Sequence, residues 1–87
     1  MKMTNRQIGI AKAILDVLHG WDGGQGHEIT IHAEANLLFR VMIPKNEFEE
    51  VFKELNSRGC FIGVPTEFRG TLWSLSDTGK KVRQEMA

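Results

Sequence analysis

The sequence predicts an α+β fold with a core of three helices, a short strand, a two-stranded hairpin and a C-terminal helix. Two observations carry this prediction. Before residue 60, apolar residues recur at helical spacing, and after it two short apolar runs, CFIGV and TLWSL, flank a turn. At 87 residues, the chain is long enough for one modest core, so a single domain is expected over residues 1–87.

The first helix is expected to begin near Thr4 and to end at Gly20. Thr4 and Gln7 have the spacing of a capping box, in which two side chains satisfy backbone donors at a helix start. Its apolar face is expected to hold Ile8, Ala11, Ile14, Leu15 and Leu18. The glycine-rich segment 21–28 then predicts a loop.

Residues 28–44 predict a short strand followed by a second helix. Ile29 and Ile31 alternate with polar neighbours, which favours a strand over residues 28–31. A helix is expected over about residues 33–41, ended by Pro44. Its inner positions are predicted to be Ala33, Leu37, Leu38 and Val41.

The third helix is predicted to begin at Asn46, a favourable N-cap residue, with Glu49 completing another capping box. Gly59 is expected to end this helix. Its buried stripe is predicted to be Phe48, Val51, Phe52 and Leu55.

Strands over residues 60–64 and 71–75 are expected to form a hairpin, with Pro65 and Gly70 bracketing its loop. Ser76 is a suitable cap for a final helix that runs to about Glu85. Trp73 is expected to pack in the core. Trp21, beside the glycine loop, either anchors that loop or faces a partner.

This order of elements resembles the winged-helix superfamily. The resemblance rests on FEEVFKELNSRGCFIGV and LSDTGKKVRQEM and covers about residues 4–86. The chain also looks similar to small YjcQ-like bacterial proteins. The resemblance implies that the third helix is the one that enters the major groove in DNA-binding members, and that the hairpin is the wing.

The charge pattern argues against DNA reading by this helix. Eleven basic and eleven acidic residues cancel over the chain, and residues 45–58 hold three basic and four acidic ones. Glu47, Glu49, Glu50 and Lys53 are expected to point outward, which raises the cost of approaching phosphates. The leading hypothesis is therefore a small regulatory module, bacterial or from a phage, that binds a protein partner or a second copy. Its predicted surface comprises Glu47, Glu50, Lys53, Glu67, Phe68 and Arg69.

The alternative is a DNA-binding transcription regulator. Arg69 lies at the expected tip of the wing, where it would reach the minor groove or its phosphates. The candidate DNA contacts are Lys53, Arg69, Lys80, Lys81 and Arg83. Steep weakening of binding with salt would favour this alternative over the protein module.

Other functional classes have little support in the sequence. No nucleophile–base or metal constellation indicates an enzyme, and no cofactor is expected. His27 and His32 are five residues apart rather than the four of a helical zinc motif, so no metal site is predicted. Cys60 is expected to be buried, and the single cysteine fits a reducing cytoplasm. No apolar run is long enough for a membrane span.

Overall fold

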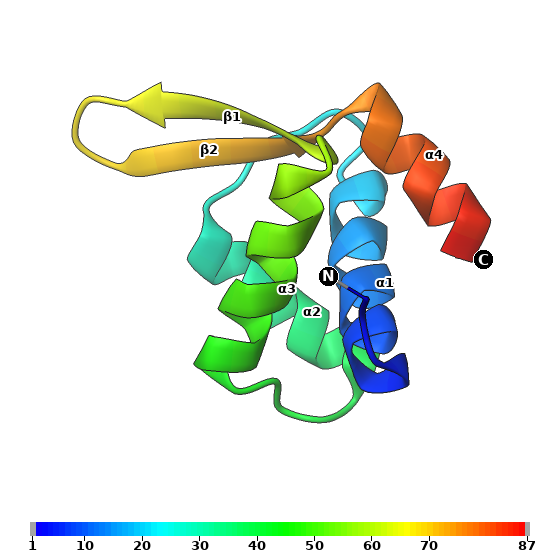
Figure 1. Cartoon of the computed structure of the whole chain (residues 1–87). Coiled ribbons are helices and arrows are strands. Elements are labelled where there is room, and N and C mark those ends of the chain that lie inside the picture. The colour runs from blue at the N-terminus through cyan, green and yellow to red at the C-terminus, as the bar shows by residue number, and fades with distance from the viewer. Residues whose placement is uncertain (1, 87) are drawn as a thin grey trace.

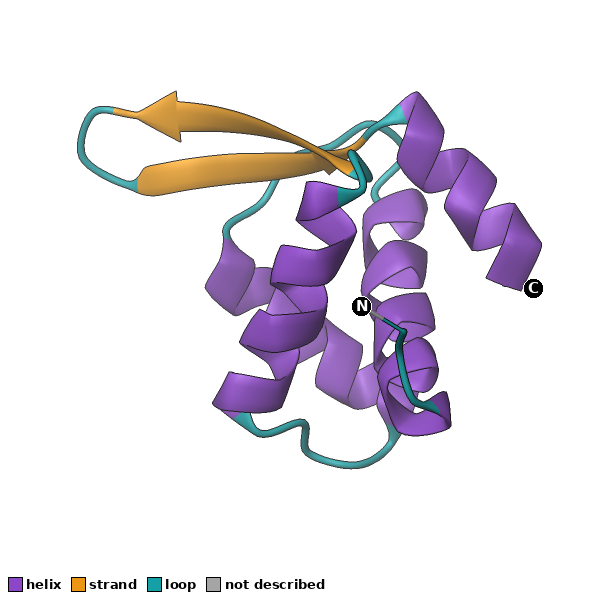
Figure 2. Cartoon of the chain, in the orientation of Figure 1, coloured by secondary structure: helices purple, strands orange, loops and turns teal. Residues whose placement is uncertain are grey.

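The computed structural model describes residues 2–86 and contains four helices and one two-stranded antiparallel sheet within them. The helices are α1 (Asn5–Gly20), α2 (Glu28–Phe39), α3 (Lys45–Ser57) and α4 (Asp77–Met86). The strands are β1 (Phe61–Thr66) and β2 (Gly70–Leu75). Figures 1 and 2 show α1, α2 and α3 gathered below the sheet, with the hairpin projecting to one side and α4 lying on the other.

The first helix agrees with its prediction. The amide of Gln7 donates to Thr4 Oγ1 at 3.2 Å, and the amide of Thr4 donates to Gln7 Oε1 at 2.8 Å, which completes the capping box. Most of the predicted apolar face is buried, but Ile8 is 39% exposed because it lies at the margin of that face. The helix ends at Gly20, as expected.

The predicted strand at residues 28–31 is wrong, because these residues form the first turn of α2. The amides of Thr30 and Ile31 donate to the carbonyl of His27 at 3.1 and 3.0 Å, which starts the helix. Residues two positions apart share a face in a strand, whereas in a helix they lie about 200° apart around the axis. Accordingly, Ile31 is fully buried while Ile29 is 79% exposed.

A residue outside the two strands pairs with the sheet. It lies in the glycine-rich loop, two positions before the start of the predicted strand at residue 28. Gly26 forms an antiparallel bridge with Trp73 of β2, with N–O distances of 3.0 and 2.8 Å. A Cβ at Gly26 would stand 2.5 Å from the ring of Trp21, so the missing side chain makes room for that indole. Trp21 therefore anchors the loop, which settles the alternative left open by the sequence.

The predicted inner positions of the second helix are also wrong. Ile31 and Ala35 are the buried residues of α2, and the predicted set (Ala33, Leu37, Leu38 and Val41) is exposed. The helix ends at Phe39 rather than Val41, because Arg40 adopts a left-handed backbone with φ of 63°. Apolar residues recur at every third or fourth position on two faces of this helix. Periodicity alone therefore did not show which of the two faces is buried.

The third helix begins one residue before its prediction, and Asn46 is not its N-cap. Pro44 occupies the cap position without a side-chain hydrogen bond, and its carbonyl accepts from the Phe48 amide at 3.0 Å. The buried stripe is confirmed as Phe48, Val51, Phe52 and Leu55. Helix α3 ends at Ser57, and Gly59 follows with a φ of +80°.

The hairpin is longer than predicted. Pro65 lies within β1 opposite Thr71, so only residues 67–69 connect the strands. Edge-strand positions tolerate proline because no ladder donor is needed there. Trp73 packs on Phe52 and Phe61 with ring centroids 5.1 and 6.2 Å apart, so the base of the hairpin continues the core.

The final helix is held against the turn that follows α3. Ser76 Oγ accepts from the Gly79 amide at 3.0 Å, which confirms Ser76 as its cap. The same hydroxyl donates to the carbonyl of Gly59. A Cβ on Gly79 would overlap the carbonyl oxygen of Cys60. The Cys60 residue is buried, as predicted.

Candidate nucleic-acid interface

The outward face of α3 is a continuous polar stripe. Its buried residues lie on the core side, which leaves one exposed row at helical spacing. We call this row the α3 stripe: Asn46, Glu49, Glu50, Lys53, Asn56 and Ser57. Every member has a side chain that is able to form hydrogen bonds, and the stripe contains no apolar residue.

Glu47 does not belong to this outward set, contrary to the sequence prediction. Its two carboxylate oxygens accept from Nε and Nη2 of Arg6 on α1, each at 2.9 Å. The hydrogen bond from Arg6 lowers the pKa of Glu47, and the guanidinium charge lowers it further. Glu54 also has a basic partner, since Arg58 Nε lies 3.2 Å from its carboxylate.

These ion pairs compensate much of the negative charge of α3. Glu54 and Glu49 pair with Arg58 and Lys45 of the same segment, at 3.2 and 3.8 Å, whereas Glu47 pairs with Arg6 from outside it and so changes its charge balance. The α3 stripe itself then holds two glutamates and Lys53, with Lys45 beside them at the start of the helix. Sequence counting missed this because the partner of Glu47 lies 41 positions away in the chain.

The remaining predicted site residues do not form one patch. Glu67, Phe68 and Arg69 form the exposed loop of the hairpin, with Phe68 89% exposed. Lys80 and Lys81 are exposed on α4. Figure 1 shows the hairpin loop at one end of the molecule and α4 at the other, so the predicted contacts are spread over two separate parts of the fold.

Arg83, the last of the candidate DNA contacts, is already engaged within the fold. Its Nε donates to Asp16 Oδ1 of α1 at 2.7 Å, and both side chains are 30% exposed. This pair joins α4 to α1. A role in holding α4 therefore accounts for Arg83 without any ligand.

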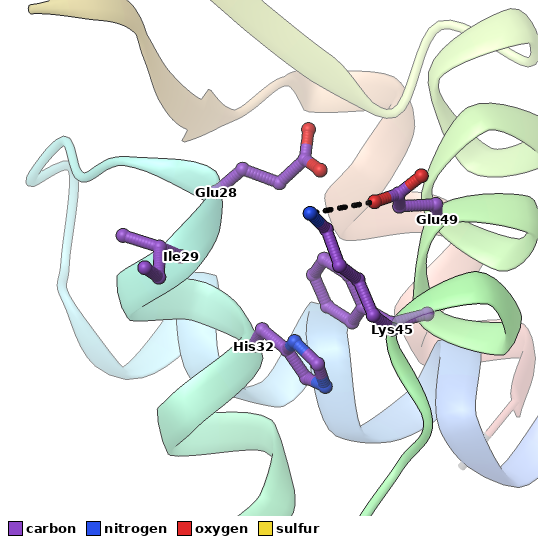
Figure 3. Close-up of a pocket in the computed structure, with 6 residues that line it drawn as sticks. Glu28, Ile29, His32, Lys45 and Glu49 are labelled. Carbon is purple, nitrogen blue, oxygen red and sulfur yellow. Dashed lines mark ion pairs between the residues drawn. The ribbon is translucent and has the colours of Figure 1, made fainter.

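A pocket of about 540 Å³ opens between the start of α2 and the start of α3 (Figure 3). Glu28 points into it, and the Lys45–Glu49 ion pair lies across from Glu28. Burial raises the pKa of Glu28, and the nearby charge of Glu49 raises it further, while Lys45 and His32 act in the opposite direction.

His32 forms the floor of this pocket and is held by the fold. Its ring stacks on Phe48 with centroids 4.4 Å apart, and Nε2 donates to the carbonyl of Ile43 at 2.6 Å. Within residues 2–86, no three His, Cys, Asp or Glu side chains lie close enough together to hold a metal ion. The floor of the pocket is thus fixed by contacts within the fold.

Solved structures resemble this arrangement over nearly the whole chain. Two are complexes of hsRosR, with S4 and with S1: each is 17% identical, with TM-scores of 0.71 and 0.70. They match 97% and 95% of this chain and 67% and 68% of theirs. The PcaV transcriptional regulator from Streptomyces coelicolor, in complex with its natural ligand, has 22% identity and a TM-score of 0.61. That match covers 97% of this chain and 52% of PcaV.

The fold is a winged helix. In it α3 is the second helix of the helix-turn-helix, and β1 and β2 form the wing. No family model matches the sequence, and no curated protein matches it. The similarity to YjcQ-like proteins therefore stays an expectation. Within the described residues, no helix is long and apolar enough to cross a membrane.

Proposed function

We propose that this chain is a DNA-binding winged-helix transcription regulator that places the α3 stripe in the major groove. The observation that carries the proposal is the stripe itself. It is a complete row of exposed hydrogen-bonding side chains on the helix that enters DNA in winged-helix DNA binders. The likeness of the fold to PcaV, a transcriptional regulator, supports the same class of function.

The side chains of the stripe suit base recognition. An asparagine amide pairs with the N6 and N7 atoms of adenine, and a glutamate accepts from the amino group of cytosine. Asn46 and Glu50 lie in the N-terminal half of α3, the part of a recognition helix that contacts base edges. Lys53, one turn further on, is a candidate phosphate contact.

The Arg6–Glu47 pair reduces the main objection to this function. An unpaired Glu47 would add a third carboxylate beside Glu49 and Glu50 and repel phosphates. Because Arg6 holds both of its oxygens at 2.9 Å, the charge of Glu47 is compensated within the protein. The protein-partner hypothesis depended on an acidic outward face of α3, and this compensation weakens it.

Arg69 is proposed as the wing contact. It lies in the exposed loop of residues 67–69, and its backbone amide donates to Thr66 Oγ1 at 3.1 Å, which fixes the turn. A guanidinium at this position is free to reach phosphates or the minor groove. The basic residues of α4 are left out of the proposed contact because they lie at the other end of the molecule.

The proposal is tested with fluorescently labelled duplexes selected from a random pool by the immobilised full chain. Binding is measured by anisotropy between about 50 and 200 mM salt, where phosphate contacts weaken steeply. Lys53→Ala and Arg69→Ala should each lower affinity across all sequences and reduce the salt slope by about one. Lys81→Ala, on α4, is the control and should leave both unchanged. An absence of selected duplexes, even at low salt, would refute the proposal.

A further inference from the structure

The loop between α1 and α2 contains an Asp-Gly pair, Asp22–Gly23, whose backbone is left-handed. Asp22 has a φ of 50° and Gly23 a φ of 86°. Both residues are exposed, and neither belongs to a helix or a strand. A left-handed backbone is uncommon outside glycine, and aspartate is one of the few residues that tolerate it.

The main-chain amide of Gly23 is not held by the fold. The amides on either side of it are held, because Asp22 N–H donates to the carbonyl of His19 at 3.1 Å and Gly24 N–H donates to that of Trp21 at 3.0 Å. Among residues 2–86 the Gly23 amide donates no hydrogen bond, and the Asp22 carboxylate has no hydrogen bond or ion pair. The amide nitrogen and the neighbouring carboxyl group are therefore both available to react.

The pair also has room to close a ring. Gly23 has no side chain, and a Cβ built there would meet nothing within 4 Å beyond its own chain neighbours. A hollow of about 520 Å³ lies beside it, and Asp22, Gly23, His19 and Lys80 are among the residues that line it. An attack of the Gly23 nitrogen on the Asp22 side chain thus has no hydrogen bond to break and no side chain to displace.

We propose that Asp22 is a site of spontaneous isomerisation to isoaspartate. The Gly23 nitrogen gives up its proton and bonds to Cγ of Asp22, and the carboxyl hydroxyl leaves with a proton as water, which forms a five-membered succinimide. Water then adds to the ring. If it breaks the bond from Gly23 nitrogen to the main-chain carbonyl carbon of Asp22, the product is isoaspartate, and if it breaks the new bond, aspartate returns. The water lost is regained, so the mass is unchanged and no oxidant is needed.

The ends of this loop are fixed, so the change reaches beyond Asp22. Trp21 Nε1 donates to Glu34 Oε1 at 3.2 Å, and Gly26 exchanges two hydrogen bonds with Trp73. In isoaspartate the main chain runs through Cβ and Cγ, which adds one atom between these two anchors. We expect the Gly26–Trp73 bridge to loosen as a result. The inference does not depend on the proposed DNA contact, because no step of it involves a ligand.

The first test ages the full chain at neutral pH and body temperature for several weeks. Protein isoaspartyl methyltransferase then transfers a labelled methyl group from S-adenosylmethionine to isoaspartate carboxylates. Label should rise with time in the tryptic peptide of residues 13–40, which contains Asp22, and stay at background in that of residues 70–80. The second peptide is the matched control, since Asp77 is exposed but lies in α4 and precedes a threonine. An unlabelled first peptide would overturn the proposal, as would equal label in both.

A variant tests whether the reacting residue is Asp22. Asp22→Gly keeps the left-handed backbone, which glycine adopts without strain, and removes the carboxyl carbon that is attacked. Its peptide of residues 13–40 should stay unlabelled, and circular dichroism checks that the variant is folded. Label in that peptide would overturn the assignment, because Asp16 would then be the reacting aspartate.

Hydrogen exchange tests the effect on the loop. Chromatography separates the aged chain into an isoaspartate fraction and an unchanged fraction. The amides of Gly26 and Trp73 should exchange several-fold faster in the isoaspartate fraction. The amide of Phe48, which donates to the Pro44 carbonyl in α3, is the control and should exchange equally in both. Equal exchange at Gly26 and Trp73 in the two fractions would overturn the predicted loosening of the bridge.

Discussion

Arg6 of α1 binds both carboxylate oxygens of Glu47 on α3, with Nε and Nη2 each 2.9 Å from an oxygen. The two residues are 41 positions apart, and their pairing joins the first helix to the start of the third. The same guanidinium lies 5.7 Å from the centre of the Phe39 ring at the end of α2. Arg6 thus contacts side chains from both helices of the helix-turn-helix and changes the charge that α3 presents.

The Arg6–Glu47 pair should make stability sensitive to acid. The hydrogen bond from Arg6 lowers the pKa of Glu47 in the folded state. Its stabilisation is therefore fully present above the ordinary carboxyl pKa of about 4.3 and is lost as the pH falls through the lowered value. Glu47→Gln should lower the melting temperature slightly at pH 7 and leave it unchanged in strong acid. An Arg6→Gln/Glu47→Gln double-mutant cycle measures the coupling, and additive effects at pH 7 would exclude it.

The same pair gives a prediction for DNA binding. Arg6→Gln should weaken binding to a selected duplex several-fold, because it leaves the carboxylate of Glu47 uncompensated near phosphates. Adding Glu47→Gln to that variant should restore most of the affinity. If the double variant stays as weak as Arg6→Gln, Arg6 contacts DNA directly and its effect through Glu47 is disproved. Anisotropy titrations at one fixed salt concentration separate the two cases.

Gly79 should be among the glycines most sensitive to substitution. A Cβ there would overlap the carbonyl oxygen of Cys60 and stand 2.6 Å from Leu75 Cδ1. Since backbone must move to relieve this overlap, Gly79→Ala should cost roughly 1–3 kcal/mol in urea unfolding. Gly20→Ala is the control, because a Cβ at Gly20 would meet no neighbouring side chain within 4 Å. In that variant the free energy of unfolding should stay unchanged or rise by up to about 1 kcal/mol, because alanine has the higher helix propensity. Equal effects of both substitutions would contradict the tight contact.

Glu28 should destabilise the protein at neutral pH. Burial raises its pKa, with a further contribution from Glu49. The cost of ionising it in the folded state is present above the raised pKa and disappears below the ordinary value of about 4.3. Glu28→Gln should therefore raise stability slightly at pH 7 and lose that advantage in acid. Urea unfolding at both pH values measures this, with Glu67→Gln in the exposed wing loop as the control. A stability loss at pH 7 would contradict the predicted sign.

The sequence by itself determined most of the architecture. Thr4 and Gln7 identified the start of α1, because a capping box is a local hydrogen-bond pattern. The stripe from Phe48 to Leu55 was correct because α3 is strongly amphipathic, with one apolar side only. Ser76 as a cap and the hairpin after Cys60 were likewise readable from neighbours in the chain.

Only the tertiary structure decided which face of α2 is inside. Its apolar residues occupy two sides, and the packing of Ile31 and Ala35 selected the inner one, which left Leu37 exposed. Tertiary structure also decided the charge of α3, because Arg6 reaches Glu47 across the fold. Both cases have one physical reason. Periodicity and capping are properties of adjacent residues, whereas burial and ion pairing depend on residues that only folding brings together.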